Sequence, residues 1–172
     1  MTAQRQERNG SWSGTGFRPG IASIALLASL AGQGFSGSAA ATTERVVVNR
    51  YTGLAIEGFD PVAYFVDARP MPGRPDFETS QAGAVWRFRN EGNRASFAAH
   101  PEVYGPRFGG YDPIDLARGV TVAGNPRFWL VSGQRLYLFG REENRDAFAA
   151  APARFLKDAA ARWPALERGL AQ

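Results

Sequence analysis

The chain has 172 residues, a hydrophobic fraction of 44% and a charged fraction of 21%. This length favours one domain with an appended segment, and the composition is typical of globular proteins rather than disordered or fibrous ones. Cysteine is absent and histidine occurs once. Disulfides, thiolate metal sites, cysteine nucleophiles and histidine-rich zinc sites are therefore excluded.

Residues 1–41 have the pattern of a Sec-type signal peptide. Basic residues precede an apolar stretch at positions 21–30 (IASIALLASL), and small residues follow it. Ala39 and Ala41 fit the small-x-small rule, which predicts cleavage near Ala41. The apolar stretch is too short for a permanent membrane anchor. We therefore expect a periplasmic or secreted protein.

The charge of the chain is mild and evenly spread. The formal net charge is +4, and removal of the signal peptide lowers it because three arginines and one glutamate precede the cleavage site. The remaining basic residues are scattered among acidic ones, whereas a nucleic-acid-binding surface needs a clustered basic stripe. We expect no nucleic-acid partner.

Two segments of the chain resemble each other. Residues 85–104 (VWRFRNEGNRASFAAHPEVY) align without a gap with residues 136–155 (LYLFGREENRDAFAAAPARF), and upstream GFDPV at 58–62 resembles GYDPI at 110–114. Two copies are too few for a solenoid. The pattern predicts an internal pseudo-twofold repeat, spanning about 58–104 and 110–155.

The predicted elements begin with an edge strand at residues 46–49. Asp60 and Asp112 each precede a proline, which is the pattern of a helix N-cap followed by the first helical residue. Three prolines and a glycine predict a loop over residues 67–76.

Each unit continues with a predicted hairpin. Residues 84–89 alternate between apolar and partly polar positions, which predicts a strand with one exposed face. Residues 128–131 and 136–139 are apolar on both faces, which predicts a central hairpin that is covered on both sides.

A helix follows each hairpin. Asn90 can cap the first helix, and Pro101 and Pro152 should break or restart the helices. We expect Arg94 and Arg145, which are equivalent in the repeat, to tie their helices to buried groups of neighbouring loops. An amphipathic stretch continues to Leu170 as a C-terminal helix.

The predicted fold is a single α+β domain over residues 45–170. Its core is an antiparallel sheet of two hairpins with packed helices. The predicted hydrophobic centre comprises Trp86, Phe88, Phe97, Tyr104, Phe128, Leu130, Tyr137, Phe139, Phe148, Phe155 and Trp163.

Residues 55–166 resemble the exported bacterial YHS domain-containing proteins. The matching pieces are AIEGFDPVAYF, WRFRNEGNRASFAAHPEVYGPRFGGY, NPRFWLVSGQRLYLF and the region of Trp163. The resemblance implies a YHS-like domain, and related small modules handle metals through cysteines. Relatives carry Gly-Tyr-Cys-Ala where this chain has Gly-Tyr-Asp-Pro at 110–113, so Asp112 stands at the thiol position. Soft-metal sites need thiolates, which speaks against an inherited copper or zinc site.

Two sets of residues are candidates for a site. A hard-metal site would use Asp60, His100, Asp112 and Asp115 as carboxylate and imidazole ligands, although helix capping and a surface histidine are the favoured explanations of these residues. A ligand pocket would use Tyr64, Arg107, Gly109, Gly110, Tyr111 and Trp129. Adjacent glycines permit close backbone approach, although a tight connection over an aromatic core is the alternative.

No acid–base–nucleophile set is visible in the sequence, which favours a non-catalytic role. The expected function is that of an exported module that binds a small ligand or an envelope protein. The alternative is a metal-handling protein that uses carboxylate and histidine ligands in place of the family's cysteines. A metal is the one cofactor that this alternative would need; the sequence itself requires none.

Overall fold

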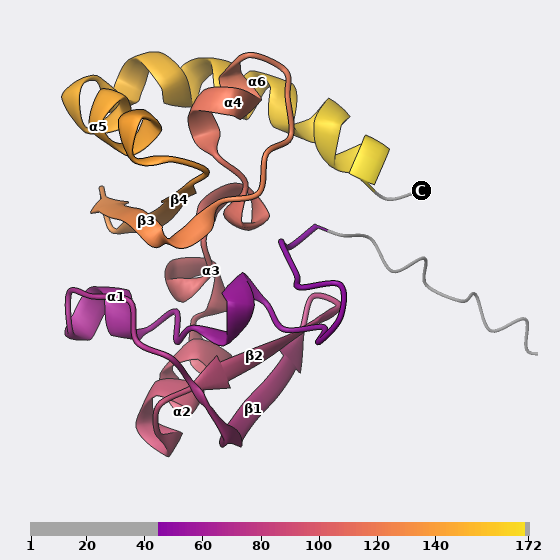
Figure 1. Ribbon diagram of the computed structural model, residues 1–172, viewed down its shortest axis with the longest axis vertical. Coiled ribbons are helices and arrows are strands. Elements are labelled where there is room, and N and C mark those ends of the chain that lie inside the picture. The colour runs from indigo at the N-terminus through magenta and orange to yellow at the C-terminus, as the bar shows by residue number, and fades with distance from the viewer. Residues whose placement is uncertain (1–44, 171–172) are drawn as a thin grey trace, which may run out of the picture. The chain divides into compact units, whose positions relative to one another are not determined.

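The computed structural model describes residues 45–170, which belong to one compact unit (Figure 1). The first half has the 3₁₀ turn η1 (Ile56–Gly58), α1 (Ala63–Val66), β1 (Arg74–Gln81), β2 (Ala84–Phe88), α2 (Glu91–Ala99) and α3 (Pro101–Tyr104). The second half has η2 (Arg107–Gly110), α4 (Pro113–Ala117), β3 (Asn125–Ser132), β4 (Arg135–Phe139), α5 (Glu142–Ala150) and α6 (Pro152–Leu170). The chain is an α+β protein, and its halves have the same elements in the same order.

The predicted signal peptide lies outside the described residues. Within residues 45–170, no helix combines the length and the apolar character that a membrane span requires.

Each pair of strands forms an antiparallel hairpin with a two-residue turn. Both turn residues have positive φ, at Ala82 (52°) and Gly83 (77°) and again at Gly133 (56°) and Gln134 (56°), which matches the twist of paired strands. The hairpins form two separate two-stranded sheets rather than the single sheet predicted. The outer edge of β2 is already occupied, because the N–H of Ala55 donates to the carbonyl of Val85 (2.8 Å).

Most local helix signals are confirmed, including the Asp112 cap and the Pro113 start of α4. The Asp60 cap and Pro61 start are wrong, because α1 begins only at Ala63, with Val62 as its N-cap. The side chain of Asn90 accepts the N–H of Asn93 (2.8 Å) and caps α2. The chain leaves the helix after α2 and after α5, and Pro101 and Pro152 each begin a new one. Proline loses no hydrogen bond at the first position of a helix, which explains the restarts. The predicted loop over residues 67–76 is shorter than expected, because β1 begins at Arg74.

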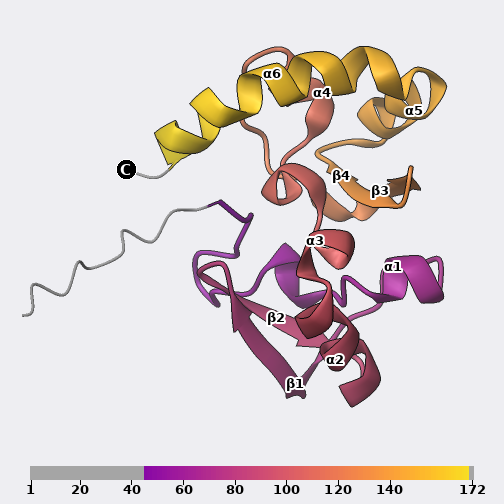
Figure 2. The ribbon, with the colours of Figure 1, turned by 180° about the vertical axis from the view of Figure 1, so that it is seen from behind.

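Strand β4 lies between two hydrophobic clusters. Leu136 and Leu138 pack with the first cluster, built mainly by the first half, whereas Tyr137 and Phe139 pack with the second. Successive side chains of a strand point to opposite faces, so one strand serves both clusters. Figures 1 and 2 show α5 and α6 on one side of the β3–β4 hairpin and α1 and α3 on the other. The hairpin is covered on both faces, as predicted, and every predicted core residue lies in or against one of the clusters.

Residues 45–49, which we call the strap, connect the two halves. The predicted edge strand at 46–49 is wrong, since only an isolated bridge joins Val48 to Ala55. The N–H of Val47 donates to the carbonyl of Gly109 (2.7 Å), and its carbonyl accepts the N–H of Ile56 (3.2 Å). The strap therefore bonds to η2 of one half and η1 of the other instead of joining a sheet.

Candidate functional site

Asp60 is a buried junction of the first half, with no exposed surface (0%). Its Oδ1 accepts the backbone N–H groups of Val62 (2.8 Å) and Ala63 (3.4 Å). Its Oδ2 accepts the backbone N–H of Arg89 (2.8 Å) and Nδ2 of Asn93 (2.6 Å). One carboxylate therefore fixes the turn before α1, the end of β2 and the start of α2.

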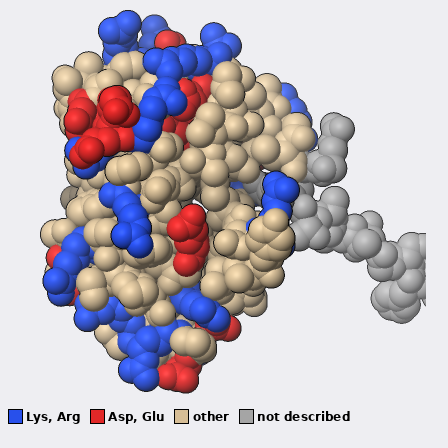
Figure 3. Space-filling view, in the orientation of Figure 1, with Lys and Arg blue, Asp and Glu red and all other residues tan. Residues whose placement is uncertain are grey.

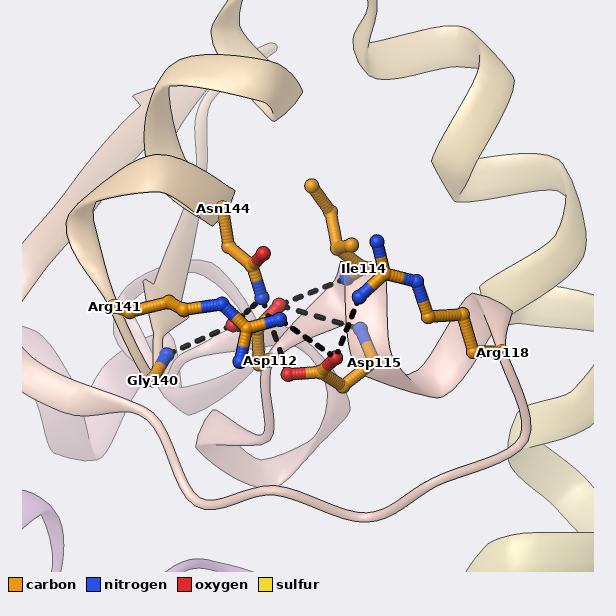
Figure 4. A network of polar contacts seen from close by, with 7 residues as sticks. All are labelled: Asp112, Ile114, Asp115, Arg118, Gly140, Arg141 and Asn144. Carbon is orange, nitrogen blue, oxygen red and sulfur yellow. Dashed lines mark hydrogen bonds and ion pairs between the residues drawn. The ribbon is translucent and has the colours of Figure 1, made fainter.

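Asp112 makes the same four contacts in the second half and is also fully buried (Figure 4). Its Oδ1 accepts the N–H groups of Ile114 (2.9 Å) and Asp115 (3.5 Å), so it caps α4. Its Oδ2 accepts the N–H of Gly140 (2.8 Å) and Nδ2 of Asn144 (2.7 Å). A carboxylate offers about four lone-pair positions, and the protein uses all of them at each aspartate. Neither Asp60 nor Asp112 has one left for a metal ion.

Asp115 belongs to the network of the second half alone, since Ala63 stands at the matching place in the first half. Its Oδ1 lies 3.1 Å from the guanidinium of Arg118 and 3.4 Å from that of Arg141. Its Oδ2 accepts Nδ2 of Asn144 (3.1 Å). Two arginines thus offset the charge of a carboxylate that is only 6% exposed.

His100 lies apart from these aspartates, between α2 and α3. Its side chain is 63% exposed, and its Nδ1 lies 3.7 Å from a carboxylate oxygen of Glu102. Nowhere in residues 45–170 do three or more histidine or acidic side chains gather in a group that could hold a metal ion. The structure does not bring Asp60, His100, Asp112 and Asp115 together.

The two arginines that the repeat singled out do not reach buried groups, so that prediction is wrong. Arg94 pairs with Glu91 (2.9 Å) and Arg145 with Glu142 (2.7 Å), each three residues earlier on its own helix. The buried tie comes from the preceding asparagine of each pair. An amide is neutral, so burying it beside the aspartate costs less desolvation free energy than burying an arginine.

Tyr64 and Trp129, two of the predicted pocket residues, form a joint between the halves. The Tyr64 side chain is buried, its hydroxyl donates to the carbonyl of Pro126 (2.9 Å), and its ring packs edge-on against Trp129 at 5.2 Å. Burial raises the pKa of the Tyr64 hydroxyl above its ordinary value, and the negative charges of Asp60 and Glu57 raise it further.

Gly110 and Tyr111 lie inside the second half. The carbonyl of Gly110 accepts the N–H of Gly124 (2.9 Å), and the ring of Tyr111 lies 5.9 Å from that of Trp163. Of the predicted pocket residues, Arg107 and Gly109 line a cleft, and the other four do not.

That open cleft, with a volume of about 390 Å³, lies where the halves meet. The first half contributes the β1–β2 turn, Trp86 of β2 and residues of α2 and α3. The second half contributes η2 and one face of α6, and the strap supplies Arg45 and Val46. Ligand sites commonly have volumes of this size and lie between structural units.

Aromatic rings form most of the apolar lining. Trp86, Phe97 and Phe108 are 3%, 1% and 6% exposed, so they form the floor of the cleft. Trp163 of α6 is only partly buried and stands against Phe108 at 5.8 Å between ring centroids. The rings of the floor are held by the two cores, whereas Trp163 is partly exposed at the wall of the cleft.

Charged groups line the cleft as well. Arg45 and Glu167 approach to 3.9 Å, and Glu102 faces His100 at 3.7 Å. The guanidinium of Arg107 lies 5.4 Å from the centre of the Phe108 ring, and among the described residues it has neither an ion pair nor a hydrogen-bond partner.

Gly109 is required by the path of the strap. It has a φ of +62°, and a Cβ atom built there would overlap the carbonyl oxygen of Arg45. Only glycine allows the strap to pass this closely over η2 and complete the cleft wall.

The sequence pattern predicts Trp86, Phe97 and Trp163 as core residues and gives no signal that Arg45 or Glu167 borders a site. Core residues that also border a cleft follow the same hydrophobic pattern as fully enclosed core residues. The periodicity of the sequence therefore cannot tell the two apart. The run from Gly105 to Gly110 holds three glycines and a proline around Arg107 and was the one local signal at this place.

Comparisons of the chain with protein-family models, with curated proteins and with solved structures found no match. The function is therefore argued from the geometry.

Proposed function

We propose that this protein is an exported, non-catalytic binding module that holds a small ligand in the cleft between its halves. Export rests on the signal-peptide pattern of residues 1–41, and the resemblance to exported YHS domain-containing proteins agrees with it. The observation that carries the binding role is the cleft itself, with an aromatic floor and charged groups along its walls.

The other prominent features serve the fold. The buried carboxylates of Asp60 and Asp112 are saturated by hydrogen bonds, and Asp115 is balanced by arginines. The cleft differs from them because Trp163 is only partly buried and Arg107 has no ion-pair or hydrogen-bond partner among the described residues. Ligand pockets typically combine an apolar lining with a few polar groups that fix orientation, and this cleft has that composition.

A nucleic-acid partner is not part of this proposal. On the face drawn in Figure 3, basic side chains are spread out and acidic ones lie among them. Such a distribution gives no continuous positive track for a phosphate backbone.

Native mass spectrometry of mature protein recovered from its own envelope tests the proposal. We expect one bound small molecule per chain, and we expect Trp163→Leu to lose it, because that change removes the aromatic wall. Trp129→Leu, outside the cleft, is the control and should keep the ligand. Thermal unfolding checks that both variants fold. A spectrum with the polypeptide mass alone, or a ligand retained by Trp163→Leu, contradicts the proposal.

A further inference from the structure

We propose, resting on the function above, that the cleft selects a small amphipathic anion. Such a ligand has an apolar, ring-bearing body and one carboxylate or similar acidic group. The body would lie on the aromatic floor, and the acidic group would meet the guanidinium of Arg107.

The charges in the cleft carry this inference. Of its two arginines, Arg45 already has an acidic neighbour in Glu167 (3.9 Å). Of its two acids, Glu102 has His100 at 3.7 Å, and Glu167 has Arg45. Arg107 alone among the charged lining residues has no oppositely charged group within ion-pair distance in residues 45–170. Among the described residues, the cleft therefore has one arginine without an acidic partner, whereas Glu167 faces Arg45 and Glu102 faces a histidine that offsets its charge only when protonated.

The position of Arg107 suits an orienting contact. It begins η2 directly before the buried Phe108, and its guanidinium stays beside that ring at 5.4 Å. A ligand ring on the aromatic floor would have its acidic group within reach of this guanidinium. Arginine presents donors in a planar fork that binds a carboxylate through two hydrogen bonds, which gives direction as well as attraction.

Arg107 also lies close enough to Tyr137, in the core behind η2, to act on its hydroxyl. Tyr137 lies on β4, against which η2 packs, and its hydroxyl has no hydrogen-bond partner among the described residues. No fully enclosed side-chain polar atom of the described residues is left unpaired, so this hydroxyl must reach solvent. Burial raises the pKa of Tyr137, and the charges of Arg107 and Arg135 oppose that rise. The guanidiniums of Arg107 and Arg135 therefore both act on the hydroxyl of Tyr137.

Three probes that share a ring and differ in charge test the inference by calorimetry: 1-naphthylacetate, its neutral amide 1-naphthylacetamide, and the cation 1-naphthylmethylamine. We expect the acetate to bind about 10-fold or more tightly than the other two, because only the acetate can form a charge-assisted hydrogen bond with the guanidinium of Arg107. Added salt should reduce this preference, because the site is open to solvent.

Variants assign the preference to one side chain. Arg107→Met should weaken the acetate about 10-fold and change the amide less than about 2-fold. The matched control is Arg127→Met, because Arg127 is also exposed and also lies over a ring, that of Phe59 at 5.9 Å, outside the cleft. It should leave all three affinities unchanged.

The outcomes separate this inference from the proposed function. If the three probes bind with equal affinity and Trp163→Leu abolishes their binding, the anion selectivity is overturned and the binding role is left intact. If Arg107→Met leaves the preference for the acetate unchanged, the role of Arg107 is overturned. If no probe binds at millimolar concentration, the inferred ligand class is wrong, and native mass spectrometry then decides the binding role separately.

Discussion

At the scale of single residues, two buried carboxylates hold the elements together. Asp112 satisfies four donors from α4, the end of β4 and α5, and Asp60 does the same in the first half. Loss of one acceptor leaves several buried N–H groups unpaired, which costs more free energy than the hydrogen bonds contribute net.

Asp112→Ala should therefore lower the free energy of unfolding by about 3 kcal/mol or more. The control is Asp76→Ala, because Asp76 makes only an exposed ion pair with Arg74 (2.9 Å), and it should cost less than about 1 kcal/mol. Urea denaturation measures both. Equal losses in the two variants would show that the buried network does not stabilise the fold.

The hydroxyl of Tyr64 makes stability depend on alkaline pH. Its pKa is raised in the folded protein, so its stabilising contribution is complete below the ordinary tyrosine pKa of about 10 and is lost as the pH rises from there toward the raised value. The free energy of unfolding should fall more steeply between pH 9.5 and about 11 in the wild type than in Tyr64→Phe.

Near pH 8, Tyr64→Phe should be about 1 kcal/mol less stable, since it leaves the carbonyl of Pro126 without this donor. Its stability curve should then approach that of the wild type above pH 10. Parallel curves across the whole pH range would contradict this account of Tyr64.

At the scale of elements, the strap completes the cleft, and Gly109 makes room for it. Both Gly109→Ala and Gly53→Ala place a side chain at positive φ, with φ values of +62° and +70°. A Cβ at Gly53 meets nothing within 4 Å, whereas one at Gly109 overlaps the strap. Comparing the stability of the two variants separates the cost of backbone strain, which both have, from the cost of displacing the strap, which only Gly109→Ala has.

We expect Gly53→Ala to cost about 1 kcal/mol, the usual penalty for a left-handed alanine, and Gly109→Ala to cost at least about 2 kcal/mol more. Amide hydrogen exchange should also show faster exchange at Val47, which donates to Gly109. A Gly109→Ala protein with wild-type exchange at Val47 would show that the strap does not need the glycine.

Local signals predicted most elements. The hairpin turns, the Asn90 cap and the two proline restarts depend on residues close in sequence, so the pattern contains them. The strap and the separation of the two sheets depend on hydrogen bonds to residues far along the chain, such as Val47 to Gly109. No local pattern encodes such contacts, so the sequence does not predict these features.

At the scale of the whole molecule, β4 contributes side chains to both hydrophobic clusters, so we expect the two halves to unfold together. Leu138 is fully buried in the cluster of the first half although it belongs to the second. Leu138→Ala should destabilise the protein by about 2–5 kcal/mol. The fluorescence of Trp86, in the first cluster, and the helical circular dichroism, to which α6 of the second contributes, should keep a single common midpoint. Separate midpoints would mean that the halves unfold independently.

The cleft could be predicted only in part for the same reason. Arg107 and Gly109 were found from a glycine-rich segment, but the opposite wall comes from Trp86 and Phe97, which precede them in the chain and have the pattern of core residues. A site built where the two halves meet can be recognised only when the positions of both halves are known.

The ring N–H signals of the tryptophans test the central claim most directly, because Trp86 and Trp163 line the cleft and Trp129 packs against Tyr64 elsewhere. When 1-naphthylacetate is added to the mature protein labelled with nitrogen-15, we expect the signals of Trp86 and Trp163 to move and that of Trp129 to stay in place. Movement of Trp129 alone, or of none of the three, would contradict the assignment of the cleft as the binding site.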